Sequence, residues 1–427
     1  MNKKLILLIL ALTSITVTWS QKPTNNPFSR FGIGQLMFQG FGRNIAMGHT
    51  GIASYDKFHY SLLNPASITS SGSQHVIFNF GLNFIGNQYQ TADTSVYSNV
   101  SDISFISARF PITDWMAFSI GFQPYSAIGY DLQLEDTLYD NETGLKLTQI
   151  YDGSGGVHQI YFEHAIKIIH KISLGYTVYF RWGDFDRYAY MHSKEPAFEQ
   201  HTNIFKTLIN HGFSFNSGII YSDTIYDASH KHDKFHFTLA ATFSPKSYLK
   251  GMYTRSIIRR IYYYGNTFLD TISFDTIERY RLPIAQTFGL GASFTFHKSF
   301  TIELNYSQQN WKNLSILDQK GIFQNSQLFA FGLEYCRDPF STRFFRRMRF
   351  RFGAYYQKDY LKLNNIPITQ YGITFGLGIP TPSTIVNTSF ELGTKGTTAN
   401  GLFKENYILF NLDFTIHSIW FIRKKYL

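Results

Sequence analysis

The sequence predicts an all-β protein, a transmembrane antiparallel β-barrel of about 14 strands with an N-terminal plug in its lumen. Three observations lead to this fold class. Apolar and polar residues alternate along most of the chain, and aromatic residues make up 18% of it. After the N-terminus, no stretch reaches the roughly 18–20 consecutive apolar residues that a membrane helix needs. Such a chain crosses a bilayer only as a closed barrel, because lipid offers no hydrogen-bond partners to open strand edges.

Residues 1–20 are expected to be a secretory signal peptide. Lys3 and Lys4 supply the charged start, residues 5–12 the apolar stretch, and Ser20 a small residue before the cleavage site. We therefore expect an exported protein that resides in the cell outer membrane.

Residues 21–74 do not alternate, and residues 42–48 and 63–66 within them carry a family resemblance that implies a plug. This stretch is rich in Gly, Asn and Ser, for example at 26–34 and 47–51. So many turn-forming residues predict irregular chain, with one short helix at most, packed against another part of the protein. Alternation begins at His75, and the barrel is therefore assigned to residues 75–427.

Strand-like stretches continue from there to the C-terminus. They fall near 75–90, 102–110, 115–130, 157–169, 172–190, 211–222, 234–250, 285–296, 299–309, 327–336, 349–362, 371–380, 385–395 and 404–421. Short connections alternate with long ones, and the longest are 131–156, 191–210 and 251–284. This asymmetry predicts short periplasmic turns and long external loops. Two periplasmic connections, 223–233 and 337–348, are longer than that rule expects.

The last strand shows the alternation most clearly. Apolar residues hold the even positions from Ile408 to Ile416, and polar residues hold most odd ones. Trp420, Phe421 and Arg423 follow, and an apolar stripe closed by aromatic and basic residues suits a lipid-facing strand at a membrane boundary. The alternative is a soluble sandwich, but a large soluble protein with 42 Phe and 29 Tyr would be prone to aggregate.

Three groups of residues carry a resemblance to a known family. Residues 42–48 followed by 63–66 resemble the plug segment of the FadL/TodX hydrophobic-compound transporters of the outer membrane. Residues 283–311 resemble that family's late strands with their trailing Trp, here Trp311. The ending at 404–425 is similar to members from Bacteroidetes-type bacteria.

The resemblance implies a barrel whose lumen is blocked by the plug until the plug rearranges, often with lateral exit of substrate at a kinked strand. It places Asn64, Pro65, Ala66 and Gly48 in the plug as gate residues. Pro65 fixes one backbone angle and Asn64 can bond a neighbouring amide, so the tripeptide is expected to hold a defined turn. The alternative is that it only caps the approach to the first strand.

The leading functional hypothesis is passive uptake of hydrophobic small molecules, such as fatty acids or aromatic hydrocarbons, through a plug-gated lumen. The candidate ligand-binding residues are the plug phenylalanines Phe28, Phe31, Phe38 and Phe41, where they meet the barrel wall. The rival hypothesis is a binding or assembly barrel of a type IX-like outer-membrane secretion complex. In that case external loops hold protein partners and no small molecule crosses.

Five arginines are expected to anchor the barrel in outer-membrane lipid and lipopolysaccharide: Arg255, Arg259, Arg260, Arg346 and Arg347. The first three are the expected external group, whose alternative role is to grip lipid phosphates or a substrate carboxylate. An ordinary girdle of solvated basic heads is favoured. The other two belong to a basic run that suggests nucleic-acid binding in a cytosolic protein, but no nucleic-acid partner is expected behind a signal peptide.

No enzyme activity, metal or cofactor is predicted. His230, His232 and His236 cluster, but no acidic or cysteine ligand completes a metal set, and a solvated polar turn is favoured. Asp413 and His417 suggest a hydrolase, yet the sequence shows no signature of a nucleophile or an oxyanion site.

Overall fold

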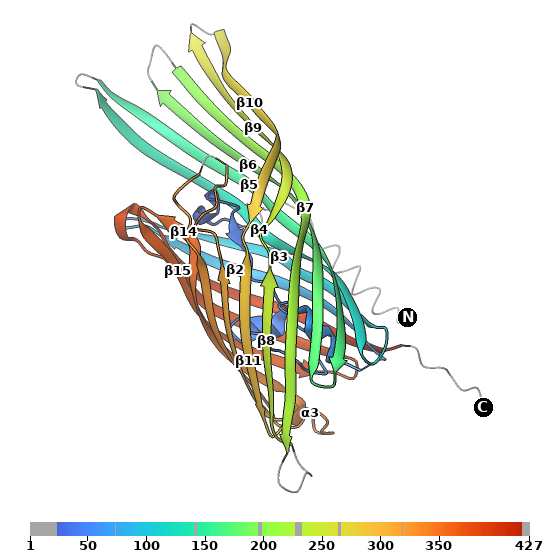
Figure 1. Cartoon of the computed structure of the whole chain (residues 1–427). Helices are drawn as coiled ribbons and strands as arrows, with labels where there is room; N and C mark the ends of the chain where they lie inside the picture. Colours follow the sequence, from blue (N-terminus) through green and yellow to red (C-terminus); the bar gives the residue numbers. More distant parts are fainter. Residues whose placement is uncertain are drawn as a thin grey trace, which may run out of the picture.

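The protein forms a closed antiparallel β-barrel of 14 strands (Figure 1). The structure, a computed structural model, describes residues 24–420 apart from 73, 141–142, 195–198, 227–232, 264–265 and 318, so the expected signal peptide lies outside the described residues. The barrel closes between its first and last strands, β2 (His75–Gln90) and β17 (Lys404–Ile419), which pair along their whole lengths. The fold class predicted from the alternation is confirmed.

Twelve of these strands are continuous, and two are interrupted. The continuous ones are β2, β3 (Ser95–Pro111), β4 (Met116–Asp140), β5 (Thr143–Ile169), β6 (Ile172–Lys194), β7 (Glu199–Tyr226), β12 (Phe300–Gln309), β13 (Ser326–Cys336), β14 (Arg349–Leu363), β15 (Ile366–Pro380), β16 (Thr384–Gly396) and β17. One interrupted strand consists of β8 (Asp233–Ser244) and β9 (Ser247–Tyr263), and the other of β10 (Asn266–Ile284) and β11 (Thr287–Phe296). Because β8 pairs with β11 and β9 pairs with β10, the two interruptions lie beside each other in the wall.

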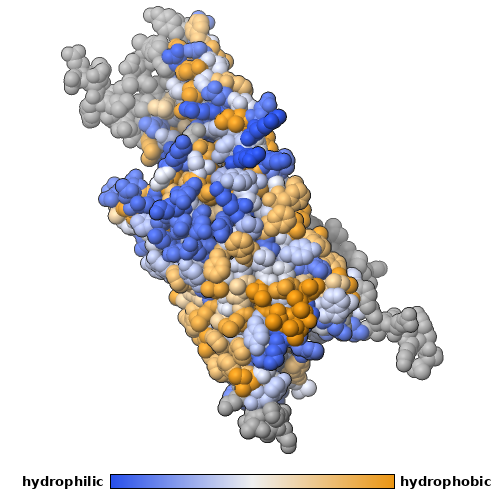
Figure 2. Space-filling model, in the orientation of Figure 1, coloured by the Kyte–Doolittle hydropathy of each residue, from blue (hydrophilic) through white to orange (hydrophobic). Residues whose placement is uncertain are grey.

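Period-two alternation separates a lipid-facing surface from a lumenal one. Leu290, Leu304 and Phe329 on adjacent strands are all exposed outward, and Figure 2 shows apolar side chains gathered over the lower part of the visible face. Polar residues at alternate positions, such as Asn305, are buried inside. Among the described helices, none has the length and apolarity that a bilayer crossing requires.

The predicted long external loops are wrong, because those stretches are strands. The β4–β5 ladder runs on to Asp140↔Thr143, and the β9–β10 ladder to Tyr263↔Asn266. Strands β5, β6, β9 and β10 consequently extend far beyond β14 and β15 (Figure 1). Both faces of β10 are solvent-exposed along most of its length, so its sequence carries no apolar stripe to mark it as a strand.

The predicted strand at 234–250 is also corrected, because it breaks at Pro245 and Lys246 between β8 and β9. Proline has no N–H to give to the ladder, so it is not accommodated within a continuous central strand. The predicted strand at 285–296 is the lower half of the neighbouring interrupted strand, whose break lies at Ala285 and Gln286.

Residues 24–74, the N-terminal segment, lie inside the barrel (Figure 1). The segment contains η1 (Pro27–Arg30), β1 (Gln35–Leu36), α2 (Gly42–Ala46) and η2 (Pro65–Thr69). Elsewhere, α3 (Phe344–Arg347) and η3 (Ala399–Gly401) lie in connections between strands. Ile33, Met47 and Ile68 of the segment are completely buried. The barrel core is thus formed between this segment and the inner face of the wall.

Candidate functional site

The wall is discontinuous between β3 and β4. These strands pair only from Pro111↔Ala117 to Ile106↔Phe122, whereas β3 stays paired with β2 up to its start at Ser95. Beyond this ladder, the neighbour of β4 is the N-terminal segment, because β1 pairs with it at Leu36↔Ser126. The next amide of the segment, at Met37, donates to the carbonyl oxygen of Tyr125 at 3.0 Å. The segment therefore fills the opening in the wall.

A glutamine cluster fixes the segment at this opening. The amide nitrogen of Gln39 donates to the carbonyl oxygens of Met37 at 2.8 Å and Pro124 at 3.3 Å. Its side-chain oxygen accepts from Gln123 and, at 2.7 Å, from Gln159 on β5. These bonds connect the opening to side chains deeper in the lumen.

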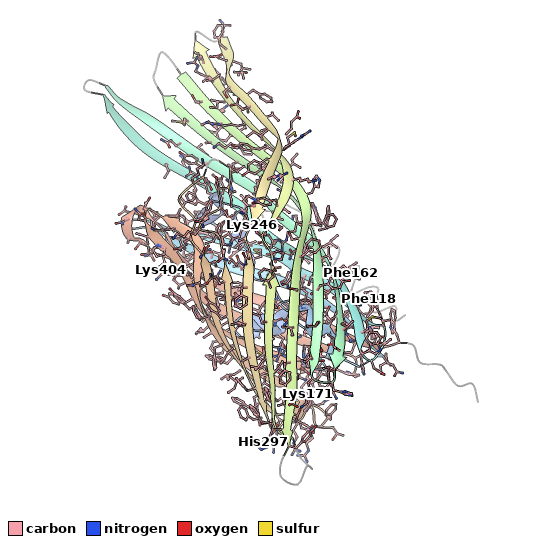
Figure 3. The ribbon with its side chains drawn as sticks, in the orientation of Figure 1. Phe118, Phe162, Lys171, Lys246, His297 and Lys404 are labelled. Atoms are coloured by element: carbon pink, nitrogen blue, oxygen red, sulfur yellow. The ribbon has the colours of Figure 1, made fainter. Side chains whose placement is uncertain are left out.

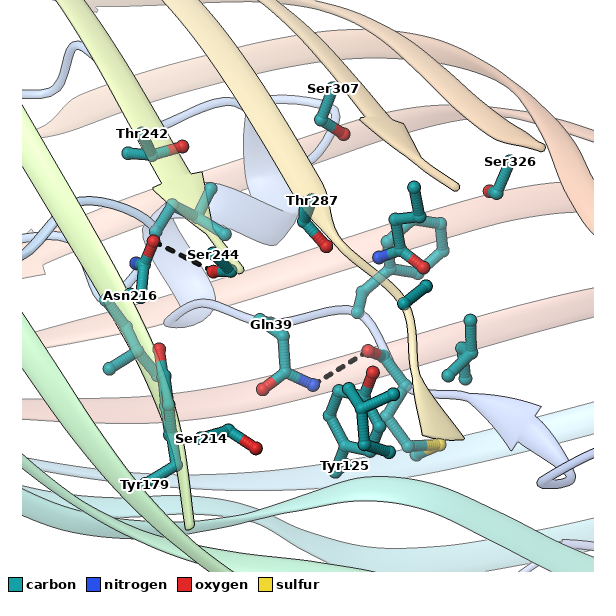
Figure 4. A pocket seen from close by; sticks show the side chains of 18 of the residues that line it. Gln39, Tyr125, Tyr179, Ser214, Asn216, Thr242, Ser244, Thr287, Ser307 and Ser326 are labelled. Atoms are coloured by element: carbon teal, nitrogen blue, oxygen red, sulfur yellow. Dashed lines mark hydrogen bonds between the residues drawn. The ribbon is translucent and has the colours of Figure 1, made fainter. Parts of the chain in front are cut away.

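Two cavities border the same part of the segment. One has a volume of about 180 Å³ and lies against β4–β7 and the interrupted strands, and we call it the large cavity (Figure 4). The other, the small cavity, has a volume of about 80 Å³ and lies against β2, β3 and β15–β17. Leu36, Met37, Phe38 and His49 line both cavities, so these four residues separate them.

The wall of the large cavity is rich in hydroxyl and amide groups. Ser214, Asn216, Thr242, Ser244, Thr287 and Ser307 supply such groups in the view of Figure 4. Pro245 and Ala285 also line the cavity. The large cavity therefore lies at the level where the two interrupted strands break.

A buried ionic cluster joins the segment to the wall. Arg43 of α2 contacts Glu303 at 2.9 Å and Glu334 at 3.3 Å. Glu334 also contacts Arg349 at 2.9 Å and Arg351 at 2.6 Å. Burial lowers the pKa of Arg43, but the two carboxylates outweigh it and hold that pKa above its ordinary value. The cluster therefore keeps its charges and holds α2 against β12, β13 and β14.

A second polar group surrounds His49, which lies between the cavities. Its Nε2 is 2.9 Å from Glu391, and that carboxylate also accepts from the hydroxyls of Tyr355 at 2.5 Å and Tyr407 at 2.7 Å. Phe38 stacks on the imidazole at a centroid distance of 3.8 Å. The barrier between the cavities is thus attached to β14, β16 and β17.

The predicted gate tripeptide forms the expected turn. Asn64 caps η2, and its Oδ1 accepts from the amide of Ala66 at 3.0 Å, with Pro65 at the first position of the helix. Its Nδ2 donates to the carbonyl oxygen of Ile52 at 3.0 Å and to that of Ile219 on β7 at 3.3 Å. The tripeptide thus contacts the barrel wall, and its role in gating remains a prediction.

Gly48, the fourth predicted gate residue, lies directly against the backbone of β14. Its amide donates to the hydroxyl of Thr374 at 2.9 Å, and its φ is +65°, which favours glycine. A Cβ built on Gly353 would lie 2.1 Å from the Gly48 nitrogen. Because neither glycine has a side chain, the backbone of the segment and the backbone of β14 lie in direct contact.

The four candidate phenylalanines have different surroundings. Phe38 lines both cavities. Phe28 and Phe31 pack in the main apolar core, with Phe28 on Phe403 at a centroid distance of 4.1 Å. Phe41 packs between Tyr60 and Phe105 in a second core cluster. Among the four, Phe38 is the one that the structure places in a cavity lining.

The candidate lipid-anchoring arginines lie at opposite ends of the molecule. Arg255, Arg259 and Arg260 belong to β9 in the extended part of the wall, and Arg346 and Arg347 to α3 at the other end (Figure 1). Arg259 contacts Asp270 at 2.6 Å, with both side chains well exposed.

The residues considered for metal binding or hydrolysis have structural partners. His236 hydrogen-bonds Thr224 at 2.9 Å, while His230 and His232 lie outside the described residues. Asp413 accepts from the amide of Gly42 at 2.9 Å and so holds the start of α2. Within the described part of the chain, no group of three or more His, Cys, Asp or Glu side chains is arranged to hold a metal ion.

Several site residues escaped the sequence reasoning. Alternation along the strands places Glu303 and Glu334 on the lumenal face, but it does not identify their partners. Their partner Arg43 is 260 residues from Glu303 in the chain. His49 and Arg181, which lines the large cavity, carried no local signal of their surroundings.

Several solved structures share this fold. The CymD monoaromatic hydrocarbon channel is 12% identical, with a TM-score of 0.59 over 91% of this chain and 100% of that one. A Pseudomonas aeruginosa FadL homologue is 11% identical, with a TM-score of 0.59 over 90% and 99%. The P. putida toluene transporter TodX is 13% identical, with a TM-score of 0.59 over 91% and 100%. At these identities the likeness shows the fold alone, which is the FadL-like barrel that the sequence resembled.

The sequence itself gives a direct family assignment. No curated protein sequence matches the chain. The family model described as BamG matches residues 1–427, the full length of the chain. The chain therefore belongs to the BamG family.

Proposed function

We propose that this protein is an outer-membrane channel for the passive uptake of hydrophobic small molecules, gated by its N-terminal segment acting as a plug. The observation that carries the proposal is the location of residues 36–38. They complete the wall at the β3–β4 opening and at the same time separate two lumenal cavities. A displacement of this one stretch would therefore connect the cavities and open the wall together.

The lining of the cavities supports an apolar cargo. Phe38 lies between them, and Leu36, Met37 and Ile52 add apolar surface beside polar groups that can orient a ligand. The structural neighbours include a monoaromatic hydrocarbon channel and a toluene transporter, which agrees with this substrate class. They give no comparable support to the rival assembly role.

The lateral opening gives the cargo an exit into the membrane. An apolar solute that leaves between β3 and β4 reaches lipid directly and avoids the aqueous periplasm. In this proposal Asn64, Pro65, Ala66 and Gly48 are the fixed points about which the mobile part of the plug moves, because each is held against the wall.

The basic groups at the two ends are proposed to set the height of the barrel in the membrane. Arg255, Arg259 and Arg260 would meet the lipopolysaccharide side, and Arg346 and Arg347 the periplasmic headgroups. Exposed Phe344 and Phe345 beside the latter pair provide the apolar component of such an anchor.

A reversible disulfide between β1 and β4 tests whether movement of the plug opens the channel. Leu36 and Ser126 are directly opposed across the β1–β4 ladder, at a separation suited to a disulfide. The L36C/S126C variant, made with C336S, is expected to lose uptake of labelled toluene and decanoate by cells when oxidised and to regain it when reduced.

The matched control is T295C/T301C, which joins two wall strands that are already paired. Oxidation of this control should leave uptake unchanged. Full uptake by the oxidised L36C/S126C variant would overturn the proposed gate, and equal uptake by cells lacking the protein would overturn the channel function.

A further inference from the structure

Arg181 on β6 is a buried cation beside the large cavity. Its side chain lines that cavity, and the residue is only 8% exposed. Nε donates to Gln159 at 2.9 Å and Nη1 to the hydroxyl of Ser214 at 3.2 Å. The guanidinium carbon lies 4.0 Å from the ring centroid of Tyr125 and 4.9 Å from that of Tyr179.

All of these partners are neutral. Among the described residues, no carboxylate forms an ion pair with Arg181, and Gln159 and Ser214 are the acceptors of its side-chain hydrogen bonds. Arg43 and Arg351, which are buried to a similar degree, both contact Glu334. A buried charge is costly unless it is paired and fully hydrogen-bonded, so an anion in the large cavity would stabilise Arg181.

The cavity beside Arg181 limits the size of that anion. Its volume of about 180 Å³ is only slightly larger than the ~150 Å³ of a cavity known to hold benzene. Tyr125 and Tyr179, on whose rings the guanidinium packs, line the cavity together with Phe38. This arrangement fits one aromatic ring that carries one small charged group, and it is too small for a long extended chain.

The donor geometry of the guanidinium also indicates which charged group of a ligand would fit. Its planar array of donors matches a carboxylate, and Ser214 and Ser247, whose hydroxyls are 2.8 Å apart across the strand interruption, lie next to it. Figure 4 shows Ser214 and Tyr179 on the same side of the cavity, with Ser326 on the far side.

We propose that the large cavity binds a small aromatic carboxylate of about the size of benzoate, with the carboxylate on Arg181 and the ring between the aromatic side chains. This inference rests on the proposed channel function and adds to it a site for aromatic molecules that carry a carboxylate. The ligand would supply the counter-charge that the folded protein itself does not provide.

The test compares benzoate with benzyl alcohol and toluene, which keep the ring and lack the charge. Binding is measured by isothermal titration calorimetry on the purified full-length protein in detergent. We expect the wild type to bind benzoate at least tenfold more tightly than benzyl alcohol. Arg181→Gln should abolish this preference, and Arg181→Lys should keep part of it, because an ammonium retains the charge and loses the planar fork.

Lys171→Gln is the matched control for the loss of one positive charge. Lys171 lies on an exposed turn far from Lys246 and the strand interruption (Figure 3), and it contacts Asp223 at 2.7 Å. Its substitution should leave both affinities unchanged. Inorganic phosphate serves as the probe for general anion binding and should not compete with benzoate.

The outcomes separate this inference from the channel proposal. If wild type binds benzoate and benzyl alcohol equally, or if Arg181→Gln keeps the preference, the carboxylate site is wrong. The channel proposal is not affected by that result, because toluene uptake by the disulfide variant tests it separately. If phosphate displaces benzoate, Arg181 is a general anion site and the aromatic specificity is wrong. If none of the aromatic probes binds and uptake is absent, both proposals fail.

Discussion

Nη2 of Arg43 on α2 lies 2.9 Å from Oε1 of Glu303 on β12, and the two side chains are only 5% and 2% exposed. The contact joins the N-terminal segment to strand β12 of the barrel wall. A buried ion pair is a poor source of net stability, but the loss of one partner leaves an uncompensated charge in a dry environment. Arg43 and Glu303 therefore fix the position of the segment more than they strengthen the barrel.

Arg43→Met is expected to destabilise the docked segment by about 3–5 kcal/mol, because Glu303 would remain buried without a counter-charge. Hydrogen exchange of residues 24–74 measures this as a loss of protection. The double variant Arg43→Met/Glu303→Gln should recover part of the protection, since the orphaned carboxylate is neutralised. Equal protection in wild type and Arg43→Met would contradict the argument.

Gly353→Ala should displace the segment from β14. The added Cβ would lie 2.1 Å from the nitrogen of Gly48 and 2.3 Å from the carbonyl carbon of Met47, and backbone atoms cannot rotate away. The expected cost is about 1–3 kcal/mol, seen as a lower unfolding temperature. Gly86→Ala is the control, because its Cβ meets only the Asn99 side chain at 3.4 Å. A similar loss in both variants would show that the close approach is unimportant.

Acidification should loosen the segment through His59. Burial lowers the pKa of His59 to about 3, against the opposing effect of Asp56, and Arg349 lowers it further. Its Nδ1 faces Asp56 at 3.3 Å, whereas Nε2 is buried with no acceptor, so protonation would create an unsatisfied donor. A depressed pKa means that the stabilisation is complete above about pH 6.5 and falls by up to ~1.4 kcal/mol per pH unit below it.

The neighbouring Asp56 changes its protonation in a lower pH range. Burial raises its pKa, but Arg349 and His59 outweigh this effect and hold it below the ordinary value, so its contribution is lost only below about pH 4. Between pH 6.5 and 4, His59 is therefore the member of this pair whose contribution is lost. Unfolding temperatures measured across that range should decrease more steeply in wild type than in His59→Gln. A parallel decrease in both proteins would point to another group.

Arg109→Met should weaken the junction between the segment and the first strand. The guanidinium of Arg109 donates to the carbonyl oxygens of Ile68 at 2.8 Å, His75 at 2.6 Å and Ser71 at 2.9 Å. Each carbonyl left unpaired in a buried site costs about 1–3 kcal/mol. Urea unfolding should show a marked loss for Arg109→Met and a smaller one for Arg109→Lys. An unchanged midpoint would mean that water replaces the guanidinium at this junction.

The barrel was predictable where each strand has one face in lipid and one in the lumen. Residues 408–416 of β17 alternate in this way, and so the chemistry of both faces is visible in the sequence. The upper part of β10 is exposed on both faces, and the same backbone structure there produces no alternation. The two stretches differ in what surrounds them: β17 lies between lipid and lumen, whereas the upper part of β10 is exposed on both faces. The local residue pattern does not specify these surroundings.

The candidate site was less predictable, because its contacts join distant parts of the chain. The turn at Asn64 depends on its next two residues and followed from local chemistry. The pairing of Arg43 with Glu303 depends on how the segment crosses the lumen, and no local rule specifies it. The isolation of Arg181 is a property of the whole cavity, since it requires that no strand around it present a carboxylate.

The wall is uneven in height. Strand β5 has 27 residues and β7 has 28, whereas β12 has 10 and β13 has 11. At about 3.3 Å per residue, the long strands continue for tens of ångströms beyond the short ones. If the proposed channel takes up solute at this end, the long strands would block approach from one side of the mouth and the short strands would leave the other side open. Uptake would then depend on the side from which the solute arrives.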